Sequence, residues 1–296
     1  MAELFKPELE SILPNWTKGA PKHVKAFFTC RTGGVSSGPY GGPNGIMGLN
    51  LALHTGDVKS CVMMNRSIVT QCCPSEPKWL TQVHGTTVLC ADDIDSAQSA
   101  PEADAQWTST SGVVACVMTA DCLPVFIADR SGRIVAAVHA GWRSLADGIL
   151  QRTVEEVRRH SSDLKPAVWL GPRIGADAFE VGEDVREAMC QHLPEESVAR
   201  AFKPAAAEGK FYADLGALAY AALESAGIDA SDIADCGLST YRDPKQFWSF
   251  RRDGERSGRH AALIWIDPNL KTVESTLSQI RRRRARGTSG LWPSSP

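Results

Sequence analysis

The stretch ADCLPVFIADRSGRIVAAVHAGWR (120–143) decides the fold, because it predicts a β-hairpin. Two runs rich in β-branched residues, 123–129 and 133–141, are separated by a short polar segment that favours a turn. A third run of the same kind, GVVACVMTA (112–120), comes directly before the hairpin. We expect these three runs to form the buried centre of one sheet.

The register of this hairpin decides whether Cys122 and His139 lie together. A four-residue turn over 129–132 would place them directly opposite each other, with Cβ atoms about 5 Å apart. A two-residue turn at 131–132 would make them diagonal neighbours, about 7–8 Å apart. Because side chains alternate along a strand, both registers leave the pair on one face, whereas a shift of one residue would separate it. Such a pair can form a Cys–His dyad or share a metal ion.

A third candidate ligand is His84, which precedes Gly85 in TQVHG (81–85). A tight turn after a strand presents a side chain at the edge of a sheet, where ligands often bind. Two histidines and one cysteine suit a catalytic zinc site, because they leave the fourth position to water. Zinc lowers the pKa of that water to about 7. The spacing alone does not bring His84 to the other two residues.

The rest of the pattern predicts an α/β (α+β) protein, a single domain with a central mixed β-sheet flanked by helices. Among the predicted helices is the amphipathic segment LADGILQRTVEEVRRHS (145–161). We divide the chain into a lead-in (1–23), one catalytic domain (24–268) and a basic, disordered tail (269–296) that contains four consecutive arginines.

The composition is that of a globular protein, with 43% hydrophobic residues, 22% charged residues and a net charge of −2. This balance gives no reason to expect binding to nucleic acid or to a membrane. The N-terminal sequence lacks the pattern of a secretory leader. Nine cysteines without regular spacing argue against a disulfide framework. We therefore expect a cytoplasmic protein with reduced cysteines.

Several other catalytic motifs are absent from the sequence. The seven histidines contain no His-x-His pair of the kind that multicopper oxidases need. The H-x-E and P-C-x-x-C pattern of cytidine deaminases is missing. So are the phosphate-binding G-x-x-x-x-G-K-S/T loop and the G-x-S-x-G motif.

A series of motifs in consistent order carries a resemblance to a known family. The most specific are TADCLPV (119–125) and AAVHAGWRS (136–144). The others include CRTGGVSSGPY (30–40), LNLALHTGD (49–57), WLTQVHGTTV (79–88), ADA (103–105), FEVGEDV (179–185) and FWSFRRDGERSGRHAALIWI (247–266). Over residues 24–268 the chain resembles the family first named polyphenol oxidases or laccase-domain proteins. Members of that family are described as purine nucleoside phosphorylases that also deaminate adenosine.

The resemblance implies a zinc site formed by His84, Cys122 and His139. It also implies a single α/β domain that is distantly similar to bacterial toxin deamidases using Cys and His. In such proteins phosphate attacks C1′ of a purine nucleoside, such as adenosine, inosine, guanosine or methylthioadenosine. The products are the free base and ribose-1-phosphate.

Five side chains in the matching motifs would contact the substrates: Arg31, Asn50, Arg66, Gln82 and Arg143. The arginines would hold phosphate through paired hydrogen bonds, and the two amides would contact ribose or base. Asp121 would either orient a metal ligand by a hydrogen bond or cap a turn.

Three alternatives remain open at this point. The first is a metal-free Cys–His hydrolase or amidase that acts on cell-wall precursors. The second is a copper-dependent polyphenol oxidase, because a site with two histidines and one cysteine also holds copper. The third is a binding module that uses the long Gly-rich segment 32–48. The sequence is compatible with a monomer or a homodimer.

Overall fold

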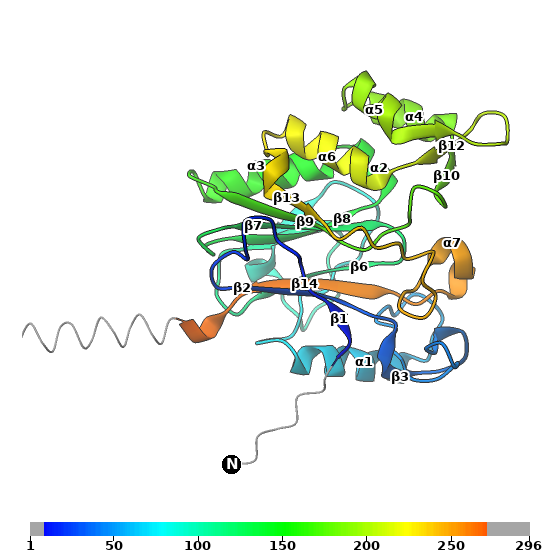
Figure 1. Cartoon of the computed structure of the whole chain (residues 1–296). Coiled ribbons are helices and arrows are strands. Elements are labelled where there is room, and N and C mark those ends of the chain that lie inside the picture. Colours follow the sequence, from blue (N-terminus) through cyan, green and yellow to red (C-terminus); the bar gives the residue numbers. More distant parts are fainter. Residues whose placement is uncertain (1–8, 271–296) are drawn as a thin grey trace, which may run out of the picture.

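Two β-sheets stack at the centre of the protein, and helices cover their outer faces (Figure 1). The computed structural model describes residues 9–270. Most of the predicted tail, 271–296, lies outside the described residues. Within the predicted lead-in, β1 (Ser11–Ile12) pairs with β2 (Val24–Thr29) and joins a sheet.

The first sheet is mixed and has six strands. Their order is β13 (Ile233–Asp235), β9 (Pro166–Leu170), β7 (Leu123–Asp129), β8 (Val135–Ala140), β5 (Ala105–Thr108) and β4 (Val88–Cys90). The β7–β8 hairpin lies at its centre. Parallel pairs occur at both edges, and the inner pairs are antiparallel. The prediction of a mixed α/β architecture is therefore confirmed.

The second sheet is antiparallel, with the order β1, β2, β14 (His260–Ile266) and β6 (Val114–Thr119). The prediction that the run 112–120 lies beside the hairpin in one sheet is wrong, because β6 pairs with β14 of this second sheet. A fully buried apolar strand can be covered on both faces in either sheet, so its composition does not specify its partner. Phe126 and Trp169 of the first sheet pack with Phe28 and Ile264 of the second in one apolar cluster.

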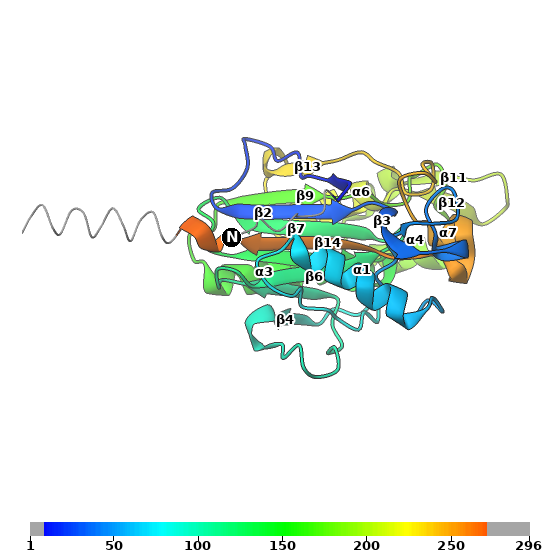
Figure 2. The ribbon, with the colours of Figure 1, turned by 90° about the horizontal axis from the view of Figure 1, so that it is seen from below.

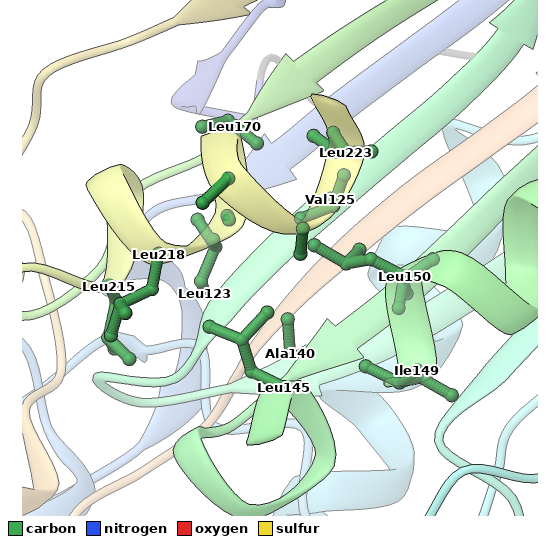
Figure 3. Packing of buried hydrophobic residues seen from close by; sticks show 14 of the residues in the cluster. Leu123, Val125, Ala140, Leu145, Ile149, Leu150, Leu170, Leu215, Leu218 and Leu223 are labelled. Carbon is green, nitrogen blue, oxygen red and sulfur yellow. The ribbon is translucent and has the colours of Figure 1, made fainter. Parts of the chain in front are cut away.

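Helices α2 (Trp142–Ala146), α3 (Ile149–His160) and α6 (Leu215–Ser225) cover the outer face of the six-stranded sheet. Figure 3 shows their leucines and isoleucines packed on Leu123, Val125 and Leu170 of the strands. The predicted helix 145–161 is divided in two at Gly148, whose φ of 84° belongs to the left-handed region that glycine tolerates.

Helix α1 (Lys59–Gln71) covers the free face of the four-stranded sheet, as the view from below shows (Figure 2). The segment predicted as a long loop contains β3 (Thr32–Ser36), which lies beside α1. A small sheet of β10 (Glu180–Gly182), β12 (Lys210–Ala213) and β11 (Phe202–Pro204) packs with α4 (Glu183–Cys190) and α5 (Glu195–Ala201). Helix α7 (Phe250–Asp253) precedes β14.

The hairpin adopts the second of the two expected registers. Pro124 pairs with His139 and Leu123 with Ala140. The turn is closed by Asp129, whose amide donates to Ile134 at 3.0 Å. The register that places Cys122 directly opposite His139 is therefore wrong, and the two residues are diagonal. Because the shift is two residues, both side chains keep the same face.

Candidate metal centre

His84, Cys122 and His139 converge at the open end of the β7–β8 hairpin. Their ligand atoms all lie within 4.8 Å of one another. The Sγ atom of Cys122 is 3.7 Å from Nε2 of His84. The rings of the two histidines are 4.8 Å apart between centroids and nearly perpendicular. A Cys and a His from one hairpin thus meet a His from a loop that precedes β4.

A buried carboxylate, Asp104, fixes both histidines. Its Oδ1 lies 2.7 Å from Nδ1 of His139, and the same carboxylate accepts hydrogen bonds from the backbone amides of Val83, His84 and Gly85. His84 has a φ of 60°, which is strained for a residue with a side chain. The three amide bonds to Asp104 hold the loop in this conformation.

The electrostatics of the site favour a thiolate. Burial alone would raise the pKa of Cys122, but the adjacent His139 and His84 lower it to about 6. Burial alone would lower the pKa of His139, but Cys122 and Asp104 raise it to about 9. The pair therefore favours a negative sulfur beside a positive imidazole at neutral pH. A thiolate is the form of cysteine that binds metals and acts as a nucleophile.

Gly141 allows the three side chains to approach. A Cβ atom at this position would lie 2.6 Å from Cδ2 of His84 and 3.2 Å from Sγ of Cys122. The first distance is too short for a real contact, so any larger residue would displace the imidazole. The lack of space for a side chain explains why glycine stands between the end of β8 and the start of α2.

The donor set fits a zinc ion. With Zn–S near 2.3 Å and Zn–N near 2.0 Å, tetrahedral geometry separates sulfur and nitrogen by about 3.5 Å. The Sγ–Nε2 distance of 3.7 Å between Cys122 and His84 agrees with this value. Asp104 engages Nδ1 of His139 and leaves Nε2 for a metal, the usual arrangement for a histidine ligand. Within residues 9–270 this is the only group of three or more such side chains suited to a metal.

The three residues line a cavity of about 750 Å³. That volume lies within the usual range for sites that bind small molecules. Four arginines also line the cavity, and each lies over an aromatic ring: Arg66 over Trp79, Arg143 over Trp142, Arg251 over Phe179 and Arg259 over Phe250. In the part of the chain that the structure describes, none of these four forms an ion pair. The cavity therefore combines aromatic surface with unbalanced positive charge.

Three of the five predicted substrate contacts line this cavity: Arg66, Gln82 and Arg143. The amide of Gln82 exchanges two hydrogen bonds of 2.7 Å with the backbone of Met118, so its polar atoms already have partners.

The other two predicted contacts hold loops together elsewhere. Arg31 donates to the carbonyl oxygens of Gly41 and Pro244 and lies over Trp248. Asn50 is fully buried and accepts hydrogen bonds from the amides of Ala52 and Arg259. Neither residue lines the cavity.

Asp121 joins distant segments beside the site. Its carboxylate accepts hydrogen bonds from the hydroxyls of Thr240 and Ser249 and from the amide of Arg251. The hydrogen bond to a ligand histidine comes instead from Asp104. Asp121, which directly precedes Cys122, therefore holds the loop around α7 against the segment that carries Cys122.

Sequence reasoning did not identify Asp104, His54 or Arg259 as site residues. Asp104 lies in the quoted motif ADA, His54 in LNLALHTGD and Arg259 in the long motif that ends in β14. The motifs thus contained a signal for each. The contacts that give these residues a role connect segments far apart in the chain, which spacing cannot reveal.

Comparison with known proteins places the chain among characterised relatives. The purine nucleoside phosphorylase PA4543 of Pseudomonas aeruginosa is 42% identical over 256 residues, which cover 86% of this chain and 98% of the relative. The purine nucleoside phosphorylase of Haemophilus influenzae is 39% identical and covers 88% of this chain and 100% of its own length. The purine nucleoside phosphorylase YfiH of Escherichia coli is 40% identical over 86% of this chain and 98% of its own length.

Solved structures with the same fold are also similar to this chain over most of its length. A Neisseria meningitidis protein of the DUF152 family is 42% identical with a TM-score of 0.75, over 87% of this chain and 99% of that one. YlmD from Geobacillus stearothermophilus is 27% identical with a TM-score of 0.76, over 88% and 98%. Residues 25–267 match the family described as multi-copper polyphenol oxidoreductase laccase. The chain therefore belongs to this family, as the resemblance in its motifs predicted.

Proposed function

We propose that the protein is a purine nucleoside phosphorylase whose active centre is the cavity at His84, Cys122 and His139. One observation carries the proposal: a His₂Cys donor set faces a cavity lined by four arginines without carboxylate partners. Relatives of nearly the same length bear the name purine nucleoside phosphorylase. That name implies a nucleoside and phosphate as substrates.

In this reaction an oxygen of phosphate forms a bond to C1′ of the nucleoside, and the bond from C1′ to the purine nitrogen breaks. Arginines of the cavity would offset the charge of the phosphate. The rings of Trp142 and Phe179, which line the cavity, offer flat apolar surfaces for a purine. The purine would leave with the electron pair of the broken bond and take up a proton.

His84, Cys122 and His139 would hold a zinc ion. When bound, zinc supplies Lewis-acid chemistry and makes a water molecule more acidic. The same centre would support adenosine deamination, in which water replaces the amino group of the purine. Asp104 would keep Nδ1 of His139 hydrogen-bonded, so that Nε2 stays directed at the centre.

We place this activity in one catalytic domain, residues 24–268, and expect it in the cytoplasm. Seven of the nine cysteines carry free thiols, which is typical of proteins in a reducing compartment: Cys30, Cys61, Cys90, Cys116, Cys122, Cys190 and Cys236. Among residues 9–270, no helix combines the length and apolar character that crossing a membrane requires.

Incubation of the purified protein with adenosine, inosine and phosphate tests the proposal. We expect hypoxanthine or adenine together with ribose-1-phosphate, and inosine when adenosine is supplied without phosphate. Cys122→Ser should abolish both activities. Absence of base release by a zinc-loaded, folded protein would reject phosphorolysis, and absence of inosine would reject deamination alone.

A second candidate is a metal-free Cys–His hydrolase or amidase. The lowered pKa of Cys122, the adjacent His139 and the carboxylate of Asp104 together resemble the arrangement of a thiol nucleophile, a base and an orienting acid. Metal analysis separates the two candidates. About one zinc per chain, bound by Cys122, would leave no free thiolate to attack a substrate.

A copper-dependent phenol oxidation is the third candidate, because copper also accepts this donor set. The structure offers one three-residue group within residues 9–270, whereas the four-electron reduction of oxygen in multicopper oxidases needs several ions. Loss of phenol oxidation on copper removal, with nucleoside cleavage intact, would mark it as a side activity.

A further inference from the structure

Three basic side chains from separate segments meet at one wall of the cavity. His54 lies in the loop before α1, Arg66 lies in α1, and Arg259 directly precedes β14. All three line the cavity. Burial lowers the pKa of His54, and the positive charges of Arg259 and Arg66 lower it further. The segments also meet at Leu51, three residues before His54: its amide donates to the carbonyl oxygen of Arg259 at 3.2 Å, and its carbonyl oxygen accepts from Nε of Arg66 at 2.9 Å. We call the three side chains the basic wall.

The two arginines are held in place by neutral partners. Nε of Arg66 donates to the carbonyl oxygen of Leu51 at 2.9 Å, and its guanidinium lies 4.1 Å above the ring of Trp79. Nη1 of Arg259 donates to the carbonyl oxygens of Ser257 and Gly258.

These contacts leave both Nη atoms of Arg66, and Nε and Nη2 of Arg259, without a hydrogen-bond partner among residues 9–270. Pre-oriented, unused guanidinium donors are the groups that bind oxyanions through paired hydrogen bonds.

Other arginines of the protein show how such charges are normally balanced. The largely buried Arg173 makes two hydrogen bonds, of 2.9 and 2.8 Å, to the carboxylate of Asp235. Neither arginine of the basic wall has an ion pair of this kind within the described residues. Burial lowers the pKa of both Arg66 and Arg259, which indicates that desolvation is not fully compensated. A bound anion would supply the missing charge.

The basic wall lines the same cavity as the metal centre. The charge of Cys122 acts on Arg259 and raises its pKa against the effect of burial. The remaining arginines of the cavity differ. Arg143 is exposed and lies over Trp142. Nη1 of Arg251 donates to the carbonyl oxygens of Ala178 and Glu180. The wall therefore combines nearness to the metal centre with free donors.

We propose that His54, Arg66 and Arg259 form the phosphate subsite, in which His54 adds one hydrogen bond to phosphate beside those of the two guanidinium groups. The proposal rests on the proposed function, in which phosphate is the second substrate. It also divides the cavity: phosphate binds at the basic wall, so the nucleoside presents C1′ toward it and places its purine on the other side, near Trp142 and Phe179.

The test compares Arg66→Gln and His54→Ala with a control, Arg158→Gln. Like Arg66, Arg158 donates to backbone carbonyl oxygens, those of Ala226 and Gly227, but it does not line the cavity. In zinc-loaded protein, the KM for phosphate should rise about 10-fold to 100-fold for Arg66→Gln, the loss expected for a charge-assisted hydrogen bond. It should rise less for His54→Ala. The KM for the nucleoside should change little in either variant, and Arg158→Gln should leave the phosphate KM unchanged.

Direct binding gives a readout that needs no turnover. Titration of the wild-type protein with orthophosphate in a calorimeter should show binding that Arg66→Gln weakens and Arg158→Gln retains. If wild type binds phosphate at the wall but never releases a base, the proposed function fails and the subsite stands. If wild type cleaves nucleosides while Arg143→Gln, and not Arg66→Gln, raises the phosphate KM, the subsite is wrong and the function stands.

Discussion

Asp104 lies one residue before β5 and its Oδ1 is 2.7 Å from Nδ1 of His139 in the neighbouring strand β8. The backbones of the two residues also pair, because the amide of His139 donates to the carbonyl oxygen of Asp104 at 2.7 Å. One aspartate thus ties the strand that carries His139 to the loop that carries His84. The positions of two of the three candidate ligands therefore depend on a residue outside that group.

Replacing Asp104 by Asn should weaken metal binding more than it weakens the fold. The amide keeps the shape but loses the charge and one acceptor, so His139 and the His84 loop become less well oriented. Loss of such an orienting partner typically lowers metal affinity about 10-fold to 100-fold. Competition with a chelator of known zinc affinity measures the effect.

Asp129→Asn is the matched control for this variant. Asp129 is equally buried and lies in the hairpin at the far end from the site, where it accepts hydrogen bonds from Arg133 and the amide of Lys165. This variant should lose about 1–3 kcal/mol of unfolding free energy and keep its zinc affinity. Equal zinc loss in both variants would mean that Asp104 acts only through stability.

The sequence predicts that Cys122 and His139 share one face of the sheet, because side chains alternate along a strand. The two expected registers differ by two residues, so both place the side chains on one face, and the structure adopts the diagonal one. The turn after a strand made His84 a candidate ligand, but only the family resemblance joined it to Cys122 and His139. Its place depends on Asp104, a contact across 20 residues that no local pattern encodes. Arg31 and Asn50 illustrate the opposite case: their motifs are specific, but the side chains bond to loops and do not line the cavity.

Gly141→Ala should disable the site while preserving the fold. Gly141 has a φ of −66° and a ψ of 160°, which alanine adopts without strain. The added methyl group would instead lie 2.6 Å from the His84 ring and push it away from Cys122. A displacement of about 1 Å at a reacting centre costs about 100-fold in rate. We expect a loss of that order in nucleoside cleavage, with an unchanged Tm in the metal-free protein.

Gly85→Ala provides the comparison for Gly141. It neighbours His84, but a Cβ atom there would meet only Val83 and Asp104 at 3.6 and 3.7 Å, which are ordinary contacts. Its amide bond to Asp104 would remain. A strong loss of activity in Gly85→Ala and none in Gly141→Ala would refute the steric explanation.

Metal-free protein should react with iodoacetamide at Cys122 at unusually low pH. Because the pKa of this thiol is lowered to about 6, the thiolate forms as pH rises through that value. Burial raises the pKa of Cys30 to about 12 and of Cys236 to about 11, so these thiols stay protonated. Mass spectrometry of peptides alkylated between pH 5 and 8 should show a midpoint near 6 for Cys122, and zinc should block the reaction. A midpoint near 9 would contradict the proposed thiolate–imidazolium pair.

The same shifts set the sign of a pH effect on the stability of metal-free protein. The lowered pKa of Cys122 contributes stability that is lost as pH falls through about 6. The raised pKa of His139 contributes stability that is lost as pH rises through about 9. Between pH 6.5 and 9 the gain from Cys122 and the loss from His139 have opposite slopes and nearly cancel, because the thiolate–imidazolium pair binds as many protons as a neutral thiol and a neutral imidazole. Thermal unfolding of metal-free wild type should therefore depend little on this pair's titration between those pH values. A steep pH dependence in that range that Cys122→Ser abolishes would exclude the ion pair.

Asp121→Asn should separate the role of Asp121 from that of Asp104. The φ of Asp121 is 84°, a region that Asn tolerates better than most residues, so the backbone need not change. The variant loses the negative charge that accepts hydrogen bonds from the hydroxyls of Thr240 and Ser249 and from the amide of Arg251. We expect about 1–3 kcal/mol less unfolding free energy and faster hydrogen exchange around α7. Zinc affinity should stay within about threefold of wild type, because none of these bonds involves a ligand. If Asp121→Asn instead reduced zinc affinity as much as Asp104→Asn, the carboxylate would act on Cys122 as well as on the loop.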